Sequence, residues 1–117
     1  MSNRNNFLHH MKLELVHFNK IQSGKKIIEL RLFDQKRRKI KIGDLIEFTN
    51  QADPDKKLRV KVLALLNYAS FSDLLNDFPA GYFGAGSKAG ALNSLRQFYS
   101  TQEEAKHTVV GIKISIL

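Results

Sequence analysis

The chain contains no cysteine, so it can form neither a disulfide framework nor a thiolate metal site. No apolar run approaches the roughly 18 residues that span a bilayer, and the N-terminus lacks the apolar core of a signal peptide. Internal repeats and low-complexity tracts are also absent. These absences exclude small secreted scaffolds and fibrous repeats, and they predict a soluble, cytoplasmic protein with no membrane partner.

Metal-ligand spacing is missing as well. His9 and His10 stand next to each other in a polar stretch, whereas His17 and His107 are isolated. Because no other ligand type recurs near them at a metal-binding spacing, we expect no metal site and no cofactor. Residues 1–10 are polar and carry no periodicity, so we expect a flexible N-terminal arm followed by one domain over residues 11–117.

The remaining composition fits a single globular domain. The 117 residues suffice for one hydrophobic core, and 43% hydrophobic with 26% charged residues is an ordinary globular balance. The net charge of +8 is unevenly placed, because residues 20–41 carry nine basic side chains against Glu29 and Asp34, a net of +7. This concentration indicates either a binding surface for a polyanion or a solvated face that promotes solubility.

Hydrophobic periodicity predicts strands, then helices, then a closing strand. Apolar alternation indicates strands at residues 13–15, 27–33, 45–49, 58–66 and 109–117. Helical spacing covers residues 17–22, 71–78 and 92–99, with Ser70 as a predicted N-cap and Ser100-x-x-Glu103 and Thr101-x-x-Glu104 as capping boxes. This order predicts an α+β fold built on a curved sheet or barrel.

The alternation also predicts which side chains share a face. The apolar residues expected to fill one common barrel interior are Ile28, Leu30, Val60, Val62, Ile112 and Ile114. Glu29 and Arg31 would then lie together on the opposite face of their strand.

The strongest local motif is Gly24-Lys25-Lys26-Ile27-Ile28-Glu29-Leu30-Arg31. Glu29 and Arg31 must point to the same side, and Lys26 can join them only if the backbone kinks at the glycine turn. An ammonium, a carboxylate and a guanidinium would then surround one spot. Such a cluster can serve a ligand, or it can be a salt-bridge network that closes the mouth of a barrel.

These residues resemble the G-x-K-x-x-E-x-R signature of the ASCH family, with Gly24, Lys26, Glu29 and Arg31 at its four positions. The similarity extends over roughly residues 11–117 and includes features of one bacterial branch. The resemblance implies a PUA-like β-barrel of about five to six strands flanked by short helices. It also implies a cleft lined by the signature residues and a role in RNA binding or RNA-linked metabolism.

Another branch of the family is similar to a small amidohydrolase that acts on acylated cytidine. Its catalytic residues are a lysine of this motif, a threonine three residues later and a glutamate from the second half of the chain. Lys26 stands at the lysine position here, whereas Glu29 occupies the threonine position and no second-half glutamate has a clear match.

The leading hypothesis is a binding module for RNA or a nucleotide-derived small molecule. Its expected ligand-binding residues are Gly24, Lys25, Lys26, Glu29, Arg31 and Tyr82, and its expected phosphate-binding residues are Lys36, Arg37, Arg38, Lys39, Lys41, Arg59 and Lys61. The rival hypothesis is a hydrolase of a modified nucleoside or of RNA that uses Lys26, Glu29 and Arg31 catalytically. A protein-interaction module would instead show an exposed apolar patch.

Overall fold

The structure is a computed structural model that describes residues 7–117. Its elements follow in this order: β1 Leu8–Leu13, α1 Leu15–Gln22, β2 Ile28–Leu32, α2 Gln35–Arg38, β3 Leu45–Asn50, β4 Lys57–Tyr68, α3 Phe71–Asn76, a 3-10 turn Ala80–Tyr82, α4 Lys88–Arg96, α5 Thr101–His107 and β5 Val109–Ile116. The predicted α+β class is confirmed. No helix among residues 7–117 is long and apolar enough to cross a membrane.

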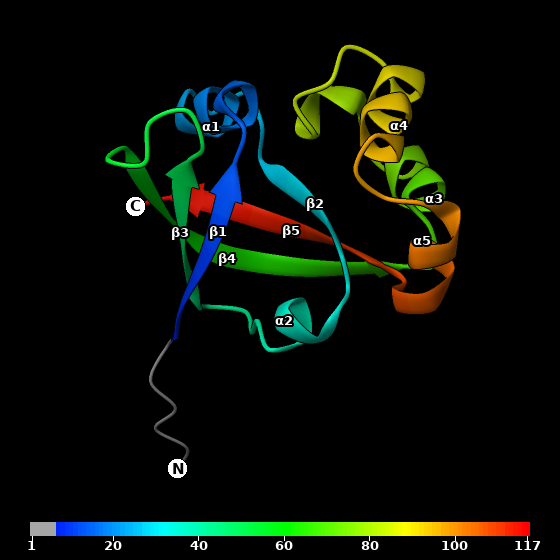
Figure 1. The fold of residues 1–117 in the computed structure, drawn as a ribbon, viewed down its shortest axis with the longest axis horizontal. Helices are drawn as coiled ribbons and strands as arrows, with labels where there is room; N and C mark the ends of the chain where they lie inside the picture. The colour runs from blue at the N-terminus through cyan, green and yellow to red at the C-terminus, as the bar shows by residue number, and fades with distance from the viewer. Residues whose placement is uncertain (1–6) are drawn as a thin grey trace.

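The five strands form one sheet in the order β1-β3-β4-β5-β2. The β1–β3 pair is parallel and the other three pairs are antiparallel. The 12-residue β4 pairs with both β3 and β5, and its register against β5 shifts between Val62 and Ala64. Such an irregularity bends a strand, and the sheet curls into a half-barrel with β1 and β2 as its edges (Figure 1).

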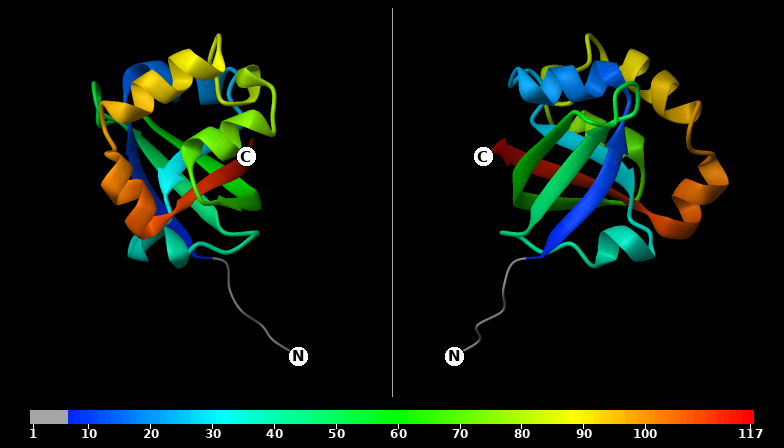
Figure 2. Two further views of the ribbon diagram at one scale, coloured as in Figure 1. Left: turned by 90° about the vertical axis from the view of Figure 1, so that its right-hand side faces the viewer. Right: turned by 60° about the vertical axis from the view of Figure 1, so that its left-hand side comes forward.

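Helices lie along one side of the curled sheet and at both of its ends. Helices α3, α4 and α5 gather along one side of it, while α1 lies at the end toward which β1 points and α2 lies at the opposite end (Figures 1 and 2). Side-chain caps begin most of these helices, because Asp34, Ser70, Ser87 and Ser100 each accept a hydrogen bond from a backbone N–H of the first turn. The predicted N-cap at Ser70 and the capping box from Ser100 to Glu103 are therefore confirmed.

Two hydrophobic clusters result, one on each face of the sheet. The inner cluster fills the curl and includes Phe48, Val60, Val62, Ile112 and Ile114. The outer cluster lies between β2, β5 and α3, and it consists of Ile28, Leu30, Leu32, Phe71, Leu74, Leu75, Phe83 and Val109. Each fully buried large side chain contributes roughly 1.5–3 kcal/mol, so both clusters hold the fold together.

The predicted common interior is wrong for β2. Ile28 and Leu30 belong to the outer cluster, whereas Glu29 pairs with Ile112, a residue of the inner cluster. Directly opposed residues of an antiparallel pair share a face, so Glu29 and Arg31 face the inside of the curl. The physical reason is that α3 provides a second apolar surface outside the sheet, against which the apolar face of β2 packs.

The predicted boundary of the N-terminal arm also needs correction. Residues 8–10 belong to β1, which pairs with β3 over its whole length, and the predicted strand position Leu15 instead begins α1. His9 Nε2 lies 2.8 Å from Asp44 Oδ2, so this histidine is held in the fold. The part of the expected arm before residue 7 lies outside the described residues.

We expect Glu104 of α5 to stabilise the packing of α3, α4 and α5. Its carboxylate accepts a hydrogen bond of 2.8 Å from the backbone N–H of Phe71 and forms an ion pair with Arg96. Replacing Glu104 by alanine should lower the free energy of unfolding by about 2–3 kcal/mol, because a buried donor and a partly buried cation lose their partner. The same change at the neighbouring, exposed Glu103 should cost about 1 kcal/mol through the lost capping box. Equal losses in urea denaturation would contradict this role.

Candidate functional site

A buried ion cluster occupies the seam between the two edge strands β1 and β2. Glu29 Oε1 lies 2.8 Å from Lys26 Nζ, and Glu29 Oε2 accepts a hydrogen bond of 2.7 Å from Arg31 Nε. Both Lys26 and Glu29 expose only 4% of their surface. We call Lys26, Glu29 and Arg31 the triad. The sequence prediction that these three groups surround one spot is realised in the structure.

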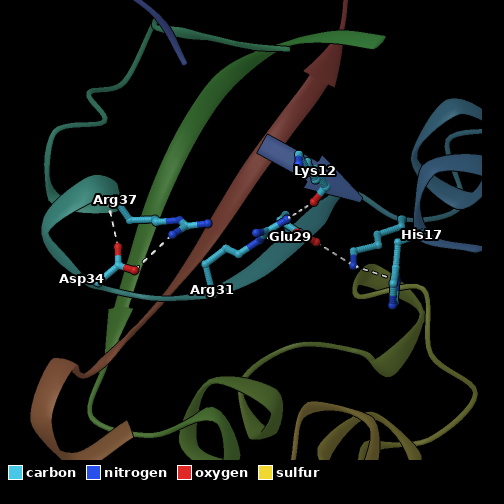
Figure 3. Close-up of polar contacts among 7 residues, drawn as sticks. Lys12, His17, Glu29, Arg31, Asp34 and Arg37 are labelled. Atoms are coloured by element: carbon cyan, nitrogen blue, oxygen red, sulfur yellow. Dashed lines mark hydrogen bonds and ion pairs between the residues drawn. The ribbon is translucent and has the colours of Figure 1, made fainter. Parts of the chain in front are cut away.

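Arg31 links the two edge strands. Its Nη2 donates a hydrogen bond of 2.8 Å to the carbonyl oxygen of Lys12 in β1 (Figure 3). The ladders pair each of these strands with an inner neighbour and not with each other, so this side-chain contact bridges the open edge of the half-barrel. The triad therefore joins the strand edges where a closed barrel would have backbone hydrogen bonds.

The backbone before β2 places Lys26 in the triad. Gly24 has φ +80°, a left-handed conformation that glycine adopts without steric penalty. Lys26 then forms an isolated antiparallel bridge to Phe83, and the N–H of Ile27 donates to the Tyr82 carbonyl. This kink turns Lys26 toward Glu29, as the glycine turn of the motif predicted.

Gly84 leaves room for Lys26 from the other side. It has φ +73°, and a Cβ added there would lie 3.0 Å from Lys26 Cβ and 3.1 Å from Lys20 Cδ. Its carbonyl accepts a hydrogen bond of 2.6 Å from Lys20 Nζ of α1. A side chain at this position would push against the aliphatic part of Lys26, so the glycine allows α1 and the 83–86 segment to enclose the triad.

The charges of the triad stabilise one another. Burial alone would raise the pKa of Glu29, but the adjacent Lys26 ammonium and Arg31 guanidinium outweigh it and lower that pKa to about 2. Burial likewise opposes the charge of Arg31, and Glu29 raises the pKa of the guanidinium. The carboxylate is consequently ionised throughout the neutral pH range.

His17 is the fourth polar group of the cluster. Its Nδ1 lies 3.1 Å from Lys26 Nζ, and because an ammonium can only donate, Nδ1 is the acceptor. Burial, reinforced by the Lys26 charge, lowers the pKa of His17 and keeps the imidazole neutral near pH 7. Glu29 and His17 thus engage two of the three N–H donors of Lys26, which leaves one for a ligand.

A cavity of about 440 Å³ opens above the triad, and we call it the seam cavity. Lys26, Glu29 and Arg31 form part of its lining together with His17 and Lys20 of α1. The opposite wall is mainly apolar and comes from the 83–86 segment, α4 and the residues just after it. Its members include Phe83, Ala85, Ala91, Leu95, Phe98 and Tyr99. The cavity therefore combines a charged floor with an apolar wall.

Three aromatic residues of the second half of the chain differ in their relation to this cavity. Phe98, which falls within the helical spacing predicted over residues 92–99, is 56% exposed and lines the seam cavity. Tyr82 was expected to contact a ligand, but it does not line this cavity, and its ring packs against Phe78 with centroids 6.4 Å apart. Tyr99 lines the cavity and stacks on Phe71.

The remaining predicted site residues are spread over different surfaces. Gly24 and Lys25 are exposed and do not line the seam cavity. Lys36 and Arg37 lie in an adjoining recess, whereas Arg38 sits 4.3 Å above the Phe33 ring and donates to the His107 carbonyl. Lys39 and Lys41 are exposed.

Arg59 and Lys61 lie on the outer face of β4. They alternate with Val60, which belongs to the inner cluster, and Arg59 pairs with Glu47 at 3.6 Å. The predicted phosphate-binding residues therefore do not form one continuous surface.

Sequence reasoning missed His17, Lys20 and Phe98 as site residues. His17 and Lys20 are three positions apart on α1, a spacing that puts two side chains on one helix face. That spacing is a usable signal, but it does not reveal which partner the face meets. No group of three or more histidine, aspartate or glutamate residues suited to a metal ion occurs among residues 7–117.

Comparison with known proteins assigns this chain to a family. The model of the ASCH domain matches residues 11–117, and the chain belongs to the ASCH domain family. The crystal structure of hypothetical protein PH0355 superposes with a TM-score of 0.85 at 35% sequence identity, covering 95% of this chain and 100% of that one. The PUA-like fold expected from the sequence is thereby confirmed.

A second solved relative comes from an archaeon. The solution NMR structure of protein PF0455 from Pyrococcus furiosus has a TM-score of 0.76 and 34% identity, and the match covers 95% of this chain and 98% of that one. The search of curated proteins finds no match.

The depressed pKa of Glu29 predicts how stability varies with pH. Its pKa in the folded protein, about 2, lies below its ordinary value of 4.5, so its ionised form stabilises the fold above pH 4.5. This contribution, about 3 kcal/mol, should be lost as the pH falls from 4.5 to 2. Urea denaturation at several pH values should show a shallower slope in this window for Glu29→Gln than for the wild type. The exposed Glu14→Gln serves as the control, and an unchanged slope in Glu29→Gln would contradict the assignment.

Proposed function

We propose that the seam cavity binds RNA or a nucleotide-derived small molecule. The observation that carries this proposal is the triad at the floor of a cavity whose opposite wall is apolar. Buried ion clusters rarely increase stability over apolar packing, so their presence at a cavity floor favours a binding role. The salt-bridge interpretation of the motif and the ligand interpretation are compatible, because the same contacts that bridge the strands also orient two cations toward the cavity.

The chemistry of the walls fits a nucleotide. Lys26 keeps one N–H donor for a ligand, and the Nη1 group of Arg31 makes no hydrogen bond among residues 7–117. Phe98 and Tyr99 offer aromatic surface, and single-stranded bases bind proteins by stacking on such rings while their edges accept hydrogen bonds. A volume of about 440 Å³ is in the range of small-molecule sites.

Membership in the ASCH domain family supports the same conclusion, because this family is linked to RNA binding. The enclosure of the cavity between α1 and α4 favours one nucleotide unit or a single-stranded end over a duplex. We also propose, as expected from the sequence, that the protein is cytoplasmic and that it is related to the bacterial branch of the family.

The hydrolase hypothesis has one specific observation in its favour. The neutral His17 lies within hydrogen-bond distance of Lys26 and could accept a proton from it. However, Lys26 Nζ forms an ion pair with Glu29 at 2.8 Å, and an ammonium in such a pair has no free lone pair with which to attack a substrate. A carboxylate with a pKa of about 2 is also a weak general base. Binding is therefore the better supported function.

Adjacent lysines provide a matched test of the proposal. Lys26→Met should weaken binding of nucleosides, nucleotides or short single-stranded RNAs by about tenfold or more, because a charge-assisted hydrogen bond is lost. The exposed Lys25→Met removes the same charge one residue away and should leave binding unchanged. Binding and turnover should be measured by calorimetry and chromatography on the same preparations.

The Lys26 variant should also be less stable than the wild type, since Glu29 loses a buried partner. Lys26→Arg keeps a cation at the site and should restore much of the binding if charge is what the ligand needs. Equal loss of binding in the Lys25 and Lys26 variants would contradict the seam cavity as the site.

A further inference from the structure

A second recess adjoins the seam cavity on the side of α2, and we call it the α2 recess. It has a volume of about 400 Å³ and shares Lys12, Arg31 and Gln51 with the seam cavity. Lys36 and Arg37 of α2 line it further. Arg31 therefore borders both spaces.

The α2 recess carries an excess of positive charge. Four cationic side chains line it, namely Lys12, Arg31, Lys36 and Arg37, and no carboxylate does. Two of these cations have carboxylate partners that do not line the recess. Glu29 pairs with Arg31, and Asp34 Oδ2 lies 3.0 Å from Arg37 Nη1. Lys12 and Lys36 have no ion-pair partner among residues 7–117. An anion would relieve the repulsion between these neighbours.

Two further observations indicate an unfilled polar position. The buried Nε of Arg37 makes no hydrogen bond within residues 7–117. Burial and the charges of Arg37 and Arg31 also lower the pKa of Lys36, so these three cations lie close enough to disfavour one another. A buried donor without a partner is destabilising unless a ligand or water supplies the acceptor.

We propose that the α2 recess is a phosphate subsite of the same ligand site, so that the ligand is a nucleoside carrying a phosphate ester. This inference rests on the proposed function. Guanidinium groups match phosphate oxygens in geometry and charge, and Arg31 and Arg37 offer two of them beside the lysines. The base and sugar then occupy the seam cavity against its apolar wall, and the phosphate lies on the far side of Arg31.

Of the predicted phosphate-binding residues, two line the subsite and the others do not. Arg38 is engaged with Phe33 and the His107 carbonyl, and Arg59 and Lys61 lie on the outer face of β4. Only Lys36 and Arg37 combine a basic side chain of this group with a place beside the seam cavity. The phosphate ester can belong to a free mononucleotide or to a phosphodiester of single-stranded RNA.

The experiment compares ligands that differ only in phosphate. The full chain is titrated in a calorimeter with the four common ribonucleosides, with their 3′- and 5′-monophosphates, and with short single-stranded oligoribonucleotides. We expect a monophosphate to bind about tenfold or more tightly than its nucleoside. If the oligoribonucleotide binds no more tightly than the monophosphate, the ligand is a free nucleotide. If the oligoribonucleotide binds more tightly than the monophosphate, the phosphate belongs to a phosphodiester.

Variants test the location of the subsite. Lys36→Gln combined with Arg37→Gln should abolish the gain from phosphate, while the nucleoside affinity stays the same. Lys36→Gln alone changes an exposed residue, so it provides a folded variant in which the gain should fall. The matched control, Arg59→Gln combined with Lys61→Gln, removes two positive charges from the outer face and should keep the gain.

The possible failures are distinguishable. Equal affinity of nucleoside and monophosphate for the wild type would overturn the phosphate subsite and leave the proposed function intact. A phosphate gain that persists in both α2 variants, or that the outer-face control abolishes, would overturn the location. If none of the nucleosides, monophosphates and oligoribonucleotides binds, the proposed function and this inference both fall.

Discussion

The buried carboxylate of Glu29, held between the Lys26 ammonium and the Arg31 guanidinium, is the interaction on which the site depends. Removing three charges from water is costly, and their mutual attraction offsets this only when the geometry is good. Here each carboxylate oxygen has its own cation at 2.8 Å or less. The cluster is therefore satisfied internally while both cations keep donors for a ligand.

The same cluster explains how the two edges of an incomplete barrel are held near each other. The sheet has two free edges, β1 and β2, and unpaired edges expose backbone donors and acceptors. Arg31 satisfies one of these acceptors, the Lys12 carbonyl, with a side-chain donor. A side chain spans a wider gap than a backbone hydrogen bond, so the seam can stay open as a cavity where continuous strand pairing would have filled it.

Much of the architecture could be predicted from the sequence, because apolar alternation and helix caps are local signals. The positions of β3 to β5, the Ser70 cap and the spatial convergence of Lys26, Glu29 and Arg31 follow from such signals. Alternation shows which side chains share a face, but it does not show which face is the inside of the curl. Hydrophobic clusters lie on both faces of the sheet, and β2 turns its apolar face outward, so the orientation of Ile28 and Leu30 was predicted wrongly.

Long-range placement accounts for the other differences. The start of β1 was not predicted, because His9 and His10 interrupt the apolar alternation. Its pairing partner β3 lies more than thirty residues away, so no local signal indicates the pairing. Phe98 follows helical spacing as a core residue would, yet α4 ends at Arg96 and leaves this ring beside the cavity. Charge counting identified a basic segment, but only the fold shows that Lys36 and Arg37 line the α2 recess while Arg38 donates to the His107 carbonyl.

The central claim is that the seam between β1 and β2 is the ligand site. The most direct measurement is an NMR titration of isotope-labelled protein with ribonucleoside monophosphates, following backbone and side-chain shifts. The account predicts the largest changes at Arg31, Gly84 and Phe98, and little change at Arg59 and Lys61. Changes concentrated at Arg59 and Lys61, with the seam residues unaffected, would contradict it.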